Sequence, residues 1–431
     1  MKGRLATFAM LLWLVPLAPA LAQLKTEPGD WPAWRGPDRT GISKETGLLK
    51  AWPAEGPRLL WKASNLGAGY SSPAVSRGKL FVLGTTKDTK DEECLIAIDI
   101  KNGETLWSRP FGKMAGAYPG PRCSPTVDGD RIYAISSNGK LLCAEAANGK
   151  QVWIKDFRKD FSGKAGAWAY TESPLVDGDI LVCTPGGEVA PIVALNKTTG
   201  EVIWKADIPN LPDLPGPRKR TYTTAAYSSA IVGEIQGVKQ YVQFLSGGVV
   251  GVNAATGMLL WHYDRPASET ANISTPIQYG DSIFAASAHG GGGGLANILK
   301  DGTKLEAREA FYLNQVQIDH GGMIRLGDYV YGTHSRALMC IDLKAGKIAW
   351  QDKSVGKSAI VYADGHLYVR SERGAIALVE ANPERYIEKG QFAQPERSKQ
   401  NAWAHPVIAG GRLYLRDQSV LLCYDVKQVG Q

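Results

Sequence analysis

Short segments that alternate between apolar and polar residues, separated by glycine-containing turns, recur along most of the chain. Residues 124–153, SPTVDGDRIYAISSNGKLLCAEAANGKQVW, contain four such segments. They cover residues 125–127, 131–135 and 141–145 and a last stretch that ends at Trp153, with Asp-Gly or Asn-Gly at each break. Alternation with a period of two predicts β-strands, and Asx-Gly pairs between such strands predict tight hairpin turns. The pattern therefore predicts a four-stranded antiparallel sheet, the unit that forms one blade of a β-propeller.

A glycine followed four residues later by an aromatic residue marks most repeats of this unit. The pairs are Gly103 and Trp107, Gly149 and Trp153, Gly200 and Trp204, Gly257 and Trp261, and Gly346 and Trp350. Two weaker repeats place Gly302 with Glu306 and Asn382 with Tyr386 at the same positions. The glycine permits a positive φ in the hairpin, and tryptophan is a large flat group suited to the space between neighbouring blades. Regular recurrence favours this packing role over stacking on a ligand.

An eighth repeat is split between two distant parts of the chain. Residues 405–426 provide three strands of a repeat and lack the fourth. Residues 57–64, PRLLWKAS, provide an unpaired strand with Trp61 in the tryptophan position. We expect an all-β, eight-bladed β-propeller of four-stranded antiparallel blades over residues 57–428, whose last blade is closed by the N-terminal strand at 57–64. This closure removes an open sheet edge.

The long loops are predicted to lie on one face of the propeller. The turns between the first and second strands and between the third and fourth strands are tight, so length variation falls in the remaining loops, which share a face. The longest loops are residues 85–93, 110–122, 158–170, 207–224 and 289–294. Because binding sites commonly lie on loops over a rigid scaffold, we expect the functional surface on this face, around the central channel.

The N-terminal residues predict an exported protein. A basic start precedes an apolar run at residues 5–17, and residues 20–22 (ALA) fit a cleavage site. We expect a signal peptide at 1–22, an extension at 23–56 that packs on the propeller, and a periplasmic or secreted protein without a transmembrane segment after cleavage. No cysteine follows the apolar run before Cys94, so we expect no lipid anchor.

Charge and cysteine content narrow the possible partners. Of 49 basic residues two belong to the predicted signal peptide, which leaves 47 basic and 42 acidic residues, a net charge of +5, and these charges are interspersed. We therefore expect no nucleic-acid binding.

Cysteines of an exported chain can form disulfides, but Cys143, Cys340 and Cys423 occupy an alanine position of the repeat and are predicted to be small buried core residues. Whether Cys94 and Cys123 form a disulfide stays open.

The repeat resembles that of a known family. Its pattern, SPxVxxGxxY followed by LxAxDxxTGxxxW, is similar to the repeat of pyrroloquinoline-quinone-type (PQQ-like) propellers, which include quinoprotein alcohol dehydrogenases and the barrel-assembly lipoprotein of the bacterial outer membrane. The resemblance covers residues 57–428. Three stretches resemble the exported PQQ-binding-like subgroup: WPAWRGPDRTGIS (31–43), HGGMIRLGDYVYG (320–332) and WAHPVIAGGRLYLRD (403–417). Many of the dehydrogenases carry adjacent cysteines against the quinone, and the sequence contains neither a Cys-Cys pair nor a Cys-x-x-Cys-His haem motif.

Residues just before the first strands are predicted to ring the mouth of the channel. They are Tyr70, Arg122, Glu172, Tyr227, Asn272, Asp319, His320, Ser358, Trp403 and His405. One interpretation is a polar, solvated rim that binds no cofactor. The resemblance implies another, because quinoprotein dehydrogenases use a Glu, an Asn and an Asp in this chain order around calcium and the quinone. It implies Glu172, Asn272 and Asp319 as calcium ligands, and Asp319 also as the base for the alcohol proton.

Five rim residues are the candidate cofactor-binding residues of this second interpretation, in which pyrroloquinoline quinone and calcium are the cofactors. They are Arg122, Tyr227, His320, Trp403 and His405. The guanidinium of Arg122 is suited to a carboxylate or carbonyl of the quinone.

Two functions remain open at this point, and the sequence does not decide whether the chain is an enzyme. The first is a monomeric, non-catalytic binding or scaffold propeller of the cell envelope, whose loop-rich face binds an envelope protein or a glycan. The second is a PQQ- and calcium-dependent quinoprotein dehydrogenase that oxidises an alcohol or a polymer hydroxyl. The missing adjacent cysteines favour the first function, and the ordered Glu, Asn and Asp favour the second.

Overall fold

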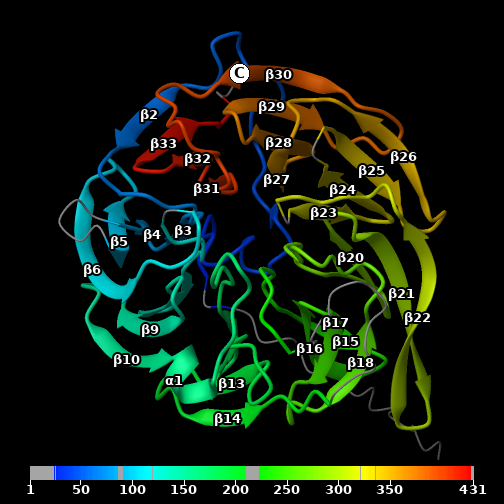
Figure 1. Cartoon of the computed structure of the whole chain (residues 1–431). Helices are drawn as coiled ribbons and strands as arrows, with labels where there is room; N and C mark the ends of the chain where they lie inside the picture. Colours follow the sequence, from blue (N-terminus) through cyan, green and yellow to red (C-terminus); the bar gives the residue numbers. More distant parts are fainter. Residues whose placement is uncertain are drawn as a thin grey trace, which may run out of the picture.

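Eight sheets stand around a central channel in the computed structural model (Figure 1): seven have four strands, and one has a fifth strand added to its four. The structure describes residues 24, 26–85, 91–118, 120–209, 223–320, 322–334 and 336–428. The predicted signal peptide at 1–22 lies outside the described residues. The predicted all-β, eight-bladed propeller of four-stranded antiparallel blades is confirmed, with one short helix, α1 (Phe157–Phe161), added between two blades.

The blades follow one another along the chain, and each begins with its innermost strand. The first four are β3 (Ala74–Ser76), β4 (Lys79–Gly84), β5 (Glu92–Asp99) and β6 (Thr105–Lys113); β7 (Thr126–Asp128), β8 (Arg131–Ile135), β9 (Lys140–Glu145) and β10 (Gln151–Asp156); β11 (Leu175–Asp177), β12 (Ile180–Cys183), β13 (Val193–Asn196) and β14 (Val202–Lys205); and β15 (Ile231–Ile235), β16 (Val238–Leu245), β17 (Gly248–Asn253) and β18 (Leu259–Tyr263). The next three are β19 (Ile277–Tyr279), β20 (Ser282–Ser287), β21 (Gly292–Asp301) and β22 (Lys304–Leu313); β23 (Met323–Leu326), β24 (Tyr329–Thr333), β25 (Leu338–Asp342) and β26 (Lys347–Asp352); and β27 (Ser358–Ala363), β28 (His366–Ser371), β29 (Ala375–Glu380) and β30 (Glu388–Ala393).

The eighth blade joins the two ends of the propeller. It contains β31 (Val407–Ala409), β32 (Arg412–Asp417) and β33 (Val420–Asp425), and its outer strand is β2 (Leu59–Ala63). β2 pairs antiparallel with β33, with Trp61 opposite Cys423 and Ala63 opposite Leu421. The predicted closure by residues 57–64 is therefore confirmed, and every blade has a neighbour on both sides.

The recurring tryptophans tie each blade to the next one. Four indole N–H groups donate to backbone carbonyls in the last hairpin of the following blade. The pairs are Trp61 with Ile100 at 3.0 Å, Trp153 with Lys197 at 3.2 Å, Trp204 with Ala254 at 3.1 Å and Trp350 with Asn382 at 2.9 Å. Each of these four rings fills the gap between two sheets with its apolar area while its one donor stays bonded. Trp261 donates instead to the side chain of Gln240 in its own blade, and the buried Nε1 of Trp107 has no partner among the described residues.

The repeated glycine is required by the tryptophan of the preceding blade. Gly257 has a φ of +74°, and a Cβ atom there would lie 2.5 Å from Cε3 of Trp204. Gly103 stands in the same relation to Trp61, at 2.6 Å. Any side chain at this position would meet both backbone strain and a steric clash.

The fifth blade departs from the predicted repeat at Gly302 and Glu306. Its last hairpin, β21 to β22, has strands of ten residues each, so the turn at Gly302 extends beyond the layer of rings. A Cβ atom on Gly302 would meet nothing within 4 Å. Phe311 takes the tryptophan position instead. A Cβ atom on Gly346 of the next blade would lie 3.1 Å from the Phe311 ring, just as other repeat glycines face a tryptophan. Assigning the position by spacing alone was wrong here, since the longer hairpin shifts the aromatic residue along the strand.

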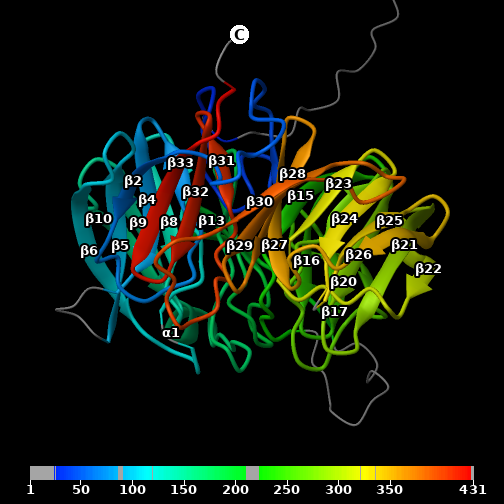
Figure 2. The ribbon, with the colours of Figure 1, turned by 90° about the horizontal axis from the view of Figure 1, so that it is seen from above.

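The segment before β2 enters the hub of the ring. Figure 1 shows this N-terminal segment crossing the centre, and Figure 2 shows it on the face opposite α1. Its short strand β1 (Ile42–Ser43) pairs in parallel with β27. Trp31 forms a backbone bridge with Val75, and the guanidinium of Arg39 donates to two carbonyls of the segment before β11, at 2.6 and 2.9 Å. We call residues 26–50 the hub segment.

The six cysteines all lie among the described residues, and each is a buried thiol. No disulfide joins Cys94 to Cys123. Burial raises the pKa of Cys143, Cys340 and Cys423 to about 12, which agrees with the predicted role as small core residues. Among the described residues, no helix has the length and apolar character needed to cross a membrane.

Candidate binding pocket at the channel mouth

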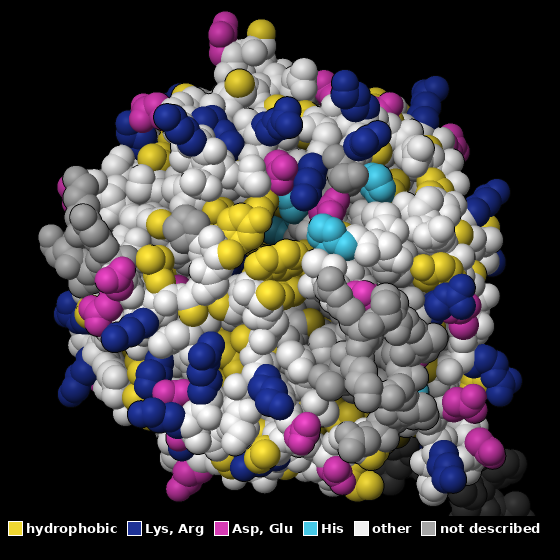
Figure 3. Space-filling model, viewed as in Figure 1, with side chains coloured by type: hydrophobic (Ala, Val, Ile, Leu, Met, Phe, Trp, Pro, Cys, Tyr) yellow, Lys and Arg dark blue, Asp and Glu magenta, His cyan; other side chains and the backbone are white. Residues whose placement is uncertain are grey.

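A pocket of about 250 Å³ opens at the centre of the face that carries the long loops. Figure 3 shows hydrophobic and histidine side chains gathered there. The walls come from residues that precede the first strands, from three long loops and from the hub segment. The lining residues are Trp34, Tyr70, Tyr118, Arg122, Trp168, Thr171, Tyr227, Ser229, Ile273, His289, Asp319, His320, Lys357, Trp403 and His405. We call this cavity the mouth pocket.

Aromatic rings form two opposing groups in the mouth pocket. Trp403 contacts Tyr70 and Tyr118, with ring centroids 4.7 and 4.8 Å apart. Trp168 lies over Tyr227 at 5.1 Å, and its backbone N–H donates to the Tyr227 hydroxyl. Such tilted and edge-to-face arrangements are favourable for aromatic pairs, so the rings hold one another in place while the pocket stays open.

The hub segment supplies the floor of the mouth pocket through Trp34. Its ring lies 4.5 Å from that of His405, and its indole N–H donates to the hydroxyl of Thr275 at 3.0 Å. His405 donates from Nε2 to the backbone carbonyl of His320 at 2.8 Å. Burial, assisted by the charge of Arg35, lowers the pKa of His405 to about 3, so this ring is neutral and structural.

Arg122 is the cation of one wall, and it lacks a carboxylate partner. Its guanidinium lies 5.7 Å from the ring centre of Tyr70 and 5.9 Å from that of Tyr118. Nη2 donates to the carbonyl of Tyr118 at 3.2 Å, and the buried Nη1 has no partner among the described residues. Glu93 acts on Arg122 through its charge, but its two oxygens accept from Ser137, and burial raises its pKa to about 7.

The opposite wall carries a network of charged groups. Glu372 accepts from Nε2 of His320 and from the indole of Trp403, each at 3.1 Å. The ammonium of Lys357 lies 3.8 Å from Glu372 and 3.9 Å from Asp319. Burial opposes ionisation of Glu372, but these hydrogen bonds and the lysine charge outweigh it and lower the pKa to about 2. Glu372 is therefore an anion that orients two residues of the pocket.

Two buried polar atoms of this wall lack a hydrogen-bond partner among the described residues. They are Oδ2 of Asp319 and Nδ1 of His320. Oδ1 of Asp319 faces Lys357. Oδ2 of Asp319 can thus accept a hydrogen bond, and the carboxylates of Asp319 and Glu372 repel an anion that approaches this wall.

Glu172 and Asn272 do not line the mouth pocket. Glu172 is buried, accepts from the backbone N–H of Thr184 at 2.8 Å, and has a pKa raised to about 8 by burial. The Asn272 amide donates to the carbonyls of Leu245 and Ser246, and its oxygen accepts from the N–H of Ser268. Oε1 of Glu172 is buried and has no hydrogen-bond partner among the described residues. Of the three predicted calcium ligands, only Asp319 lines the mouth pocket.

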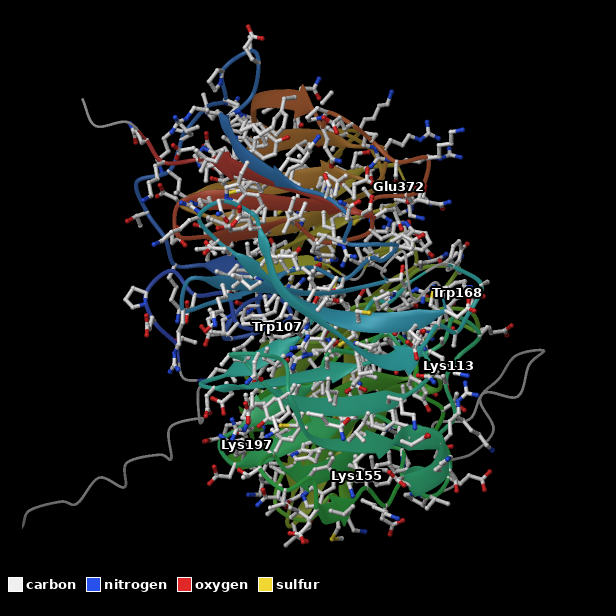
Figure 4. The ribbon with its side chains drawn as sticks, turned by 90° about the vertical axis from the view of Figure 1, so that its left-hand side faces the viewer. Trp107, Lys113, Lys155, Trp168, Lys197 and Glu372 are labelled. Atoms are coloured by element: carbon white, nitrogen blue, oxygen red, sulfur yellow. The ribbon has the colours of Figure 1, made fainter. Side chains whose placement is uncertain are left out.

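The structure brings most of the other predicted rim residues together, although Ser358 does not line the mouth pocket. Asp319 and the five candidate cofactor-binding residues, Arg122, Tyr227, His320, Trp403 and His405, all line the mouth pocket. Sequence reasoning missed Trp34, Tyr118, Trp168, His289, Lys357 and Glu372 as contributors. Tyr118 and Trp168 lie in loops already predicted on this face, whereas Glu372 follows β28 in a tight turn that no length signal marks. Figure 4 shows Glu372 and Trp168 at the same end of the propeller, away from Lys197.

Comparisons with known proteins agree with the fold. The family described as outer membrane protein assembly factor BamB matches residues 11–118 and 95–352. The assembly factor BamB of Shewanella oneidensis is 24% identical over 293 residues, which cover 64% of this chain and 68% of that protein. A tetrathionate hydrolase of Acidithiobacillus ferrooxidans is 22% identical over 440 residues, covering 90% and 80%. The structure of a quinohemoprotein alcohol dehydrogenase from Comamonas testosteroni superposes with a TM-score of 0.64 at 14% identity over 94% of this chain and 81% of that one, and this shows the fold alone.

Proposed function

The chain belongs to the family described as outer membrane protein assembly factor BamB, and we propose that it is a non-catalytic propeller of the cell envelope. In this proposal the face around the mouth pocket binds a protein that takes part in outer-membrane protein assembly. The family match over residues 11–352 supports the envelope role.

One observation carries the choice of this face. Trp168, Trp403, Tyr118 and Arg122 meet at the mouth pocket, on loops held by the rigid ring. Tryptophan, tyrosine and arginine are the residues that most often dominate the binding energy of protein interfaces, especially when a pocket receives a side chain of the partner. Few conformational changes are needed, because the rings already contact one another.

The quinoprotein dehydrogenase remains an alternative prediction. Calcium prefers several oxygen ligands around one point, and Glu172 and Asn272 do not line the mouth pocket. One oxygen of Glu172 and the amide of Asn272 form hydrogen bonds with neighbouring residues, and Oε1 of Glu172 has no partner among the described residues. The calcium site that the family resemblance implies stays a prediction.

The test of the proposed function uses a strain that lacks this protein. We expect the loss to reduce the amount of folded outer-membrane barrel proteins, measured by their heat-modifiable mobility in gels. Wild-type chain restores the amount, and a Tyr118→Ala, Trp403→Ala double variant restores it poorly. Met258→Ser, at an exposed position in a hairpin turn of blade four, is the matched control and restores it fully.

The same purified chain tests the alternative. After addition of calcium and pyrroloquinoline quinone, we expect no stoichiometric absorbance change and no dye reduction with alcohols. Dye reduction that is lost in Asp319→Ala and Glu172→Ala would establish the dehydrogenase and overturn the non-catalytic proposal.

A further inference from the structure

The mouth pocket has opposite charges on opposite sides of the ring. Arg122 precedes β7 of the second blade, and Asp319 precedes β23 of the sixth. In a ring of eight blades these two lie four blades apart, across the channel, as the positions of β9 of the second blade and β23 of the sixth in Figure 1 show. A ligand in the pocket therefore meets the guanidinium of Arg122 at one end, and at the other end it meets the carboxylate of Asp319 beside the ammonium of Lys357.

The Arg122 end is suited to an anion. A partly buried guanidinium that has no carboxylate in direct contact is costly, because its lost hydration is replaced only by one carbonyl, two tyrosine faces and the more distant charge of Glu93. A carboxylate would accept two N–H groups in the fork geometry that guanidinium presents. Among the described residues no carboxylate lies within ion-pair distance of Arg122, so this end of the pocket is open to the carboxylate of a ligand.

The centre of the pocket is suited to a flat apolar group. Trp403 with Tyr70 forms one side, and Trp168 with Tyr227 forms another. Trp34 closes the pocket from the hub. A volume of about 250 Å³ accommodates a small ring system and excludes a folded polypeptide segment of several residues.

The Asp319 end limits the number of negative charges. Asp319 faces the pocket, and Glu372 stands behind His320, with Lys357 as their shared cation. Because two carboxylates already share this one lysine, a second anionic group on the ligand would meet repulsion here. A hydroxyl or another hydrogen-bond donor would be accepted.

We propose that the mouth pocket binds a small aromatic monocarboxylate, with its carboxylate paired with Arg122 and its ring system between the tryptophan and tyrosine rings. No metal takes part in this binding. The proposal concerns a free small molecule, and it holds whether or not the surrounding loops bind a partner protein.

Isothermal titration calorimetry with 2-naphthoate tests this assignment on the purified full chain. We expect saturable binding of one molecule without added calcium. Arg122→Gln weakens the binding about tenfold or more, and Arg122→Lys, which keeps the charge but loses the fork, weakens it less. Arg325→Gln is the matched control, because Arg325 also lies over a tyrosine ring, at 5.9 Å from the centre of Tyr279, but outside the mouth pocket.

Two further ligands separate charge from shape. The uncharged 2-naphthylmethanol should bind about tenfold more weakly than 2-naphthoate, because it lacks the anion for Arg122. Naphthalene-2,6-dicarboxylate should bind no better than the monocarboxylate. The proposal is overturned if 2-naphthoate does not bind to wild-type chain, if Arg122→Gln binds it as well as wild type while its circular dichroism is native, or if the dicarboxylate binds more tightly. Normal barrel assembly alongside any of these results would leave the proposed function standing and remove only this ligand.

Discussion

The coupling between Trp204 and Gly257 can be measured by a double-mutant cycle. In the wild-type chain a Cβ on Gly257 would lie 2.5 Å from the Trp204 ring, at a φ of +74°. Gly257→Ala should therefore cost about 1–2 kcal/mol for left-handed backbone and about 1–3 kcal/mol for the clash. Trp204→Ala should cost about 3–5 kcal/mol, because the ring is buried and its N–H bond to Ala254 is lost.

The two changes should not add. Once the Trp204 ring is gone, Gly257→Ala retains only the backbone cost of about 1–2 kcal/mol, so the interaction energy is about 1–3 kcal/mol. The assay is urea unfolding followed by far-ultraviolet circular dichroism, which does not depend on the indole that is removed. Gly302→Ala is the matched control, since it has a φ of +58° and open space around it. If Gly257→Ala costs the same with and without the Trp204 ring, the proposed reason for the repeated glycine is wrong.

Four other substitutions test groups around the hub and the mouth. Burial raises the pKa of Glu172 from 4.5 to about 8, so its contribution to stability is complete below pH 4.5 and is lost as the pH rises to 8. Glu172→Gln should therefore flatten the fall of the urea midpoint with pH over this range. Glu93→Gln should flatten it up to about pH 7, because burial raises the pKa of Glu93 to about 7. Arg39→Met should lower stability by about 2–4 kcal/mol, since two buried carbonyls lose their donor, and calorimetry of thermal unfolding checks this. The pKa of Glu372 is lowered to about 2, so its contribution is present above pH 4.5 and lost as the pH falls to 2; Glu372→Gln should destabilise the chain at pH 7 and be neutral at pH 2 in acid unfolding.

The fold was predictable because each blade repeats the same local physics. Alternating strands, Asx-Gly turns and a regularly placed indole specify both a sheet and its packing on the neighbouring sheet. The unpaired strand around Trp61 predicts the closure of the ring. The predicted position of the aromatic residue was wrong in blade five, where the last hairpin is longer than in the other repeats. The longer hairpin of blade five places Phe311 in the ring layer, and spacing from Gly302 cannot reveal this.

The site was predictable only as far as the ring geometry dictates it. Position before a first strand was enough to bring Arg122, Asp319 and Trp403 to one pocket. It was not enough to give the direction of a side chain. Asn272, which precedes blade five, turns its amide to the carbonyl of Leu245 in blade four and to the N–H of Ser268 in the loop between these blades. Trp34 reaches the pocket by passing through the hub, a route with no local signal in the sequence.

The pairing of β2 with β33 sets an order on the maturation of the chain. In a nascent polypeptide, β2 stays unpaired until almost the whole ring has been synthesised, because its partner β33 is the last strand. The hub segment also stays unpaired for most of synthesis, because its strand β1 pairs with β27, which is synthesised late. The eighth blade is therefore the final sheet to be completed although it contains the earliest strand of the ring. A circular permutant that begins at the loop between two intact blades would not have to wait, and it should reach the native state faster than the natural order of strands allows.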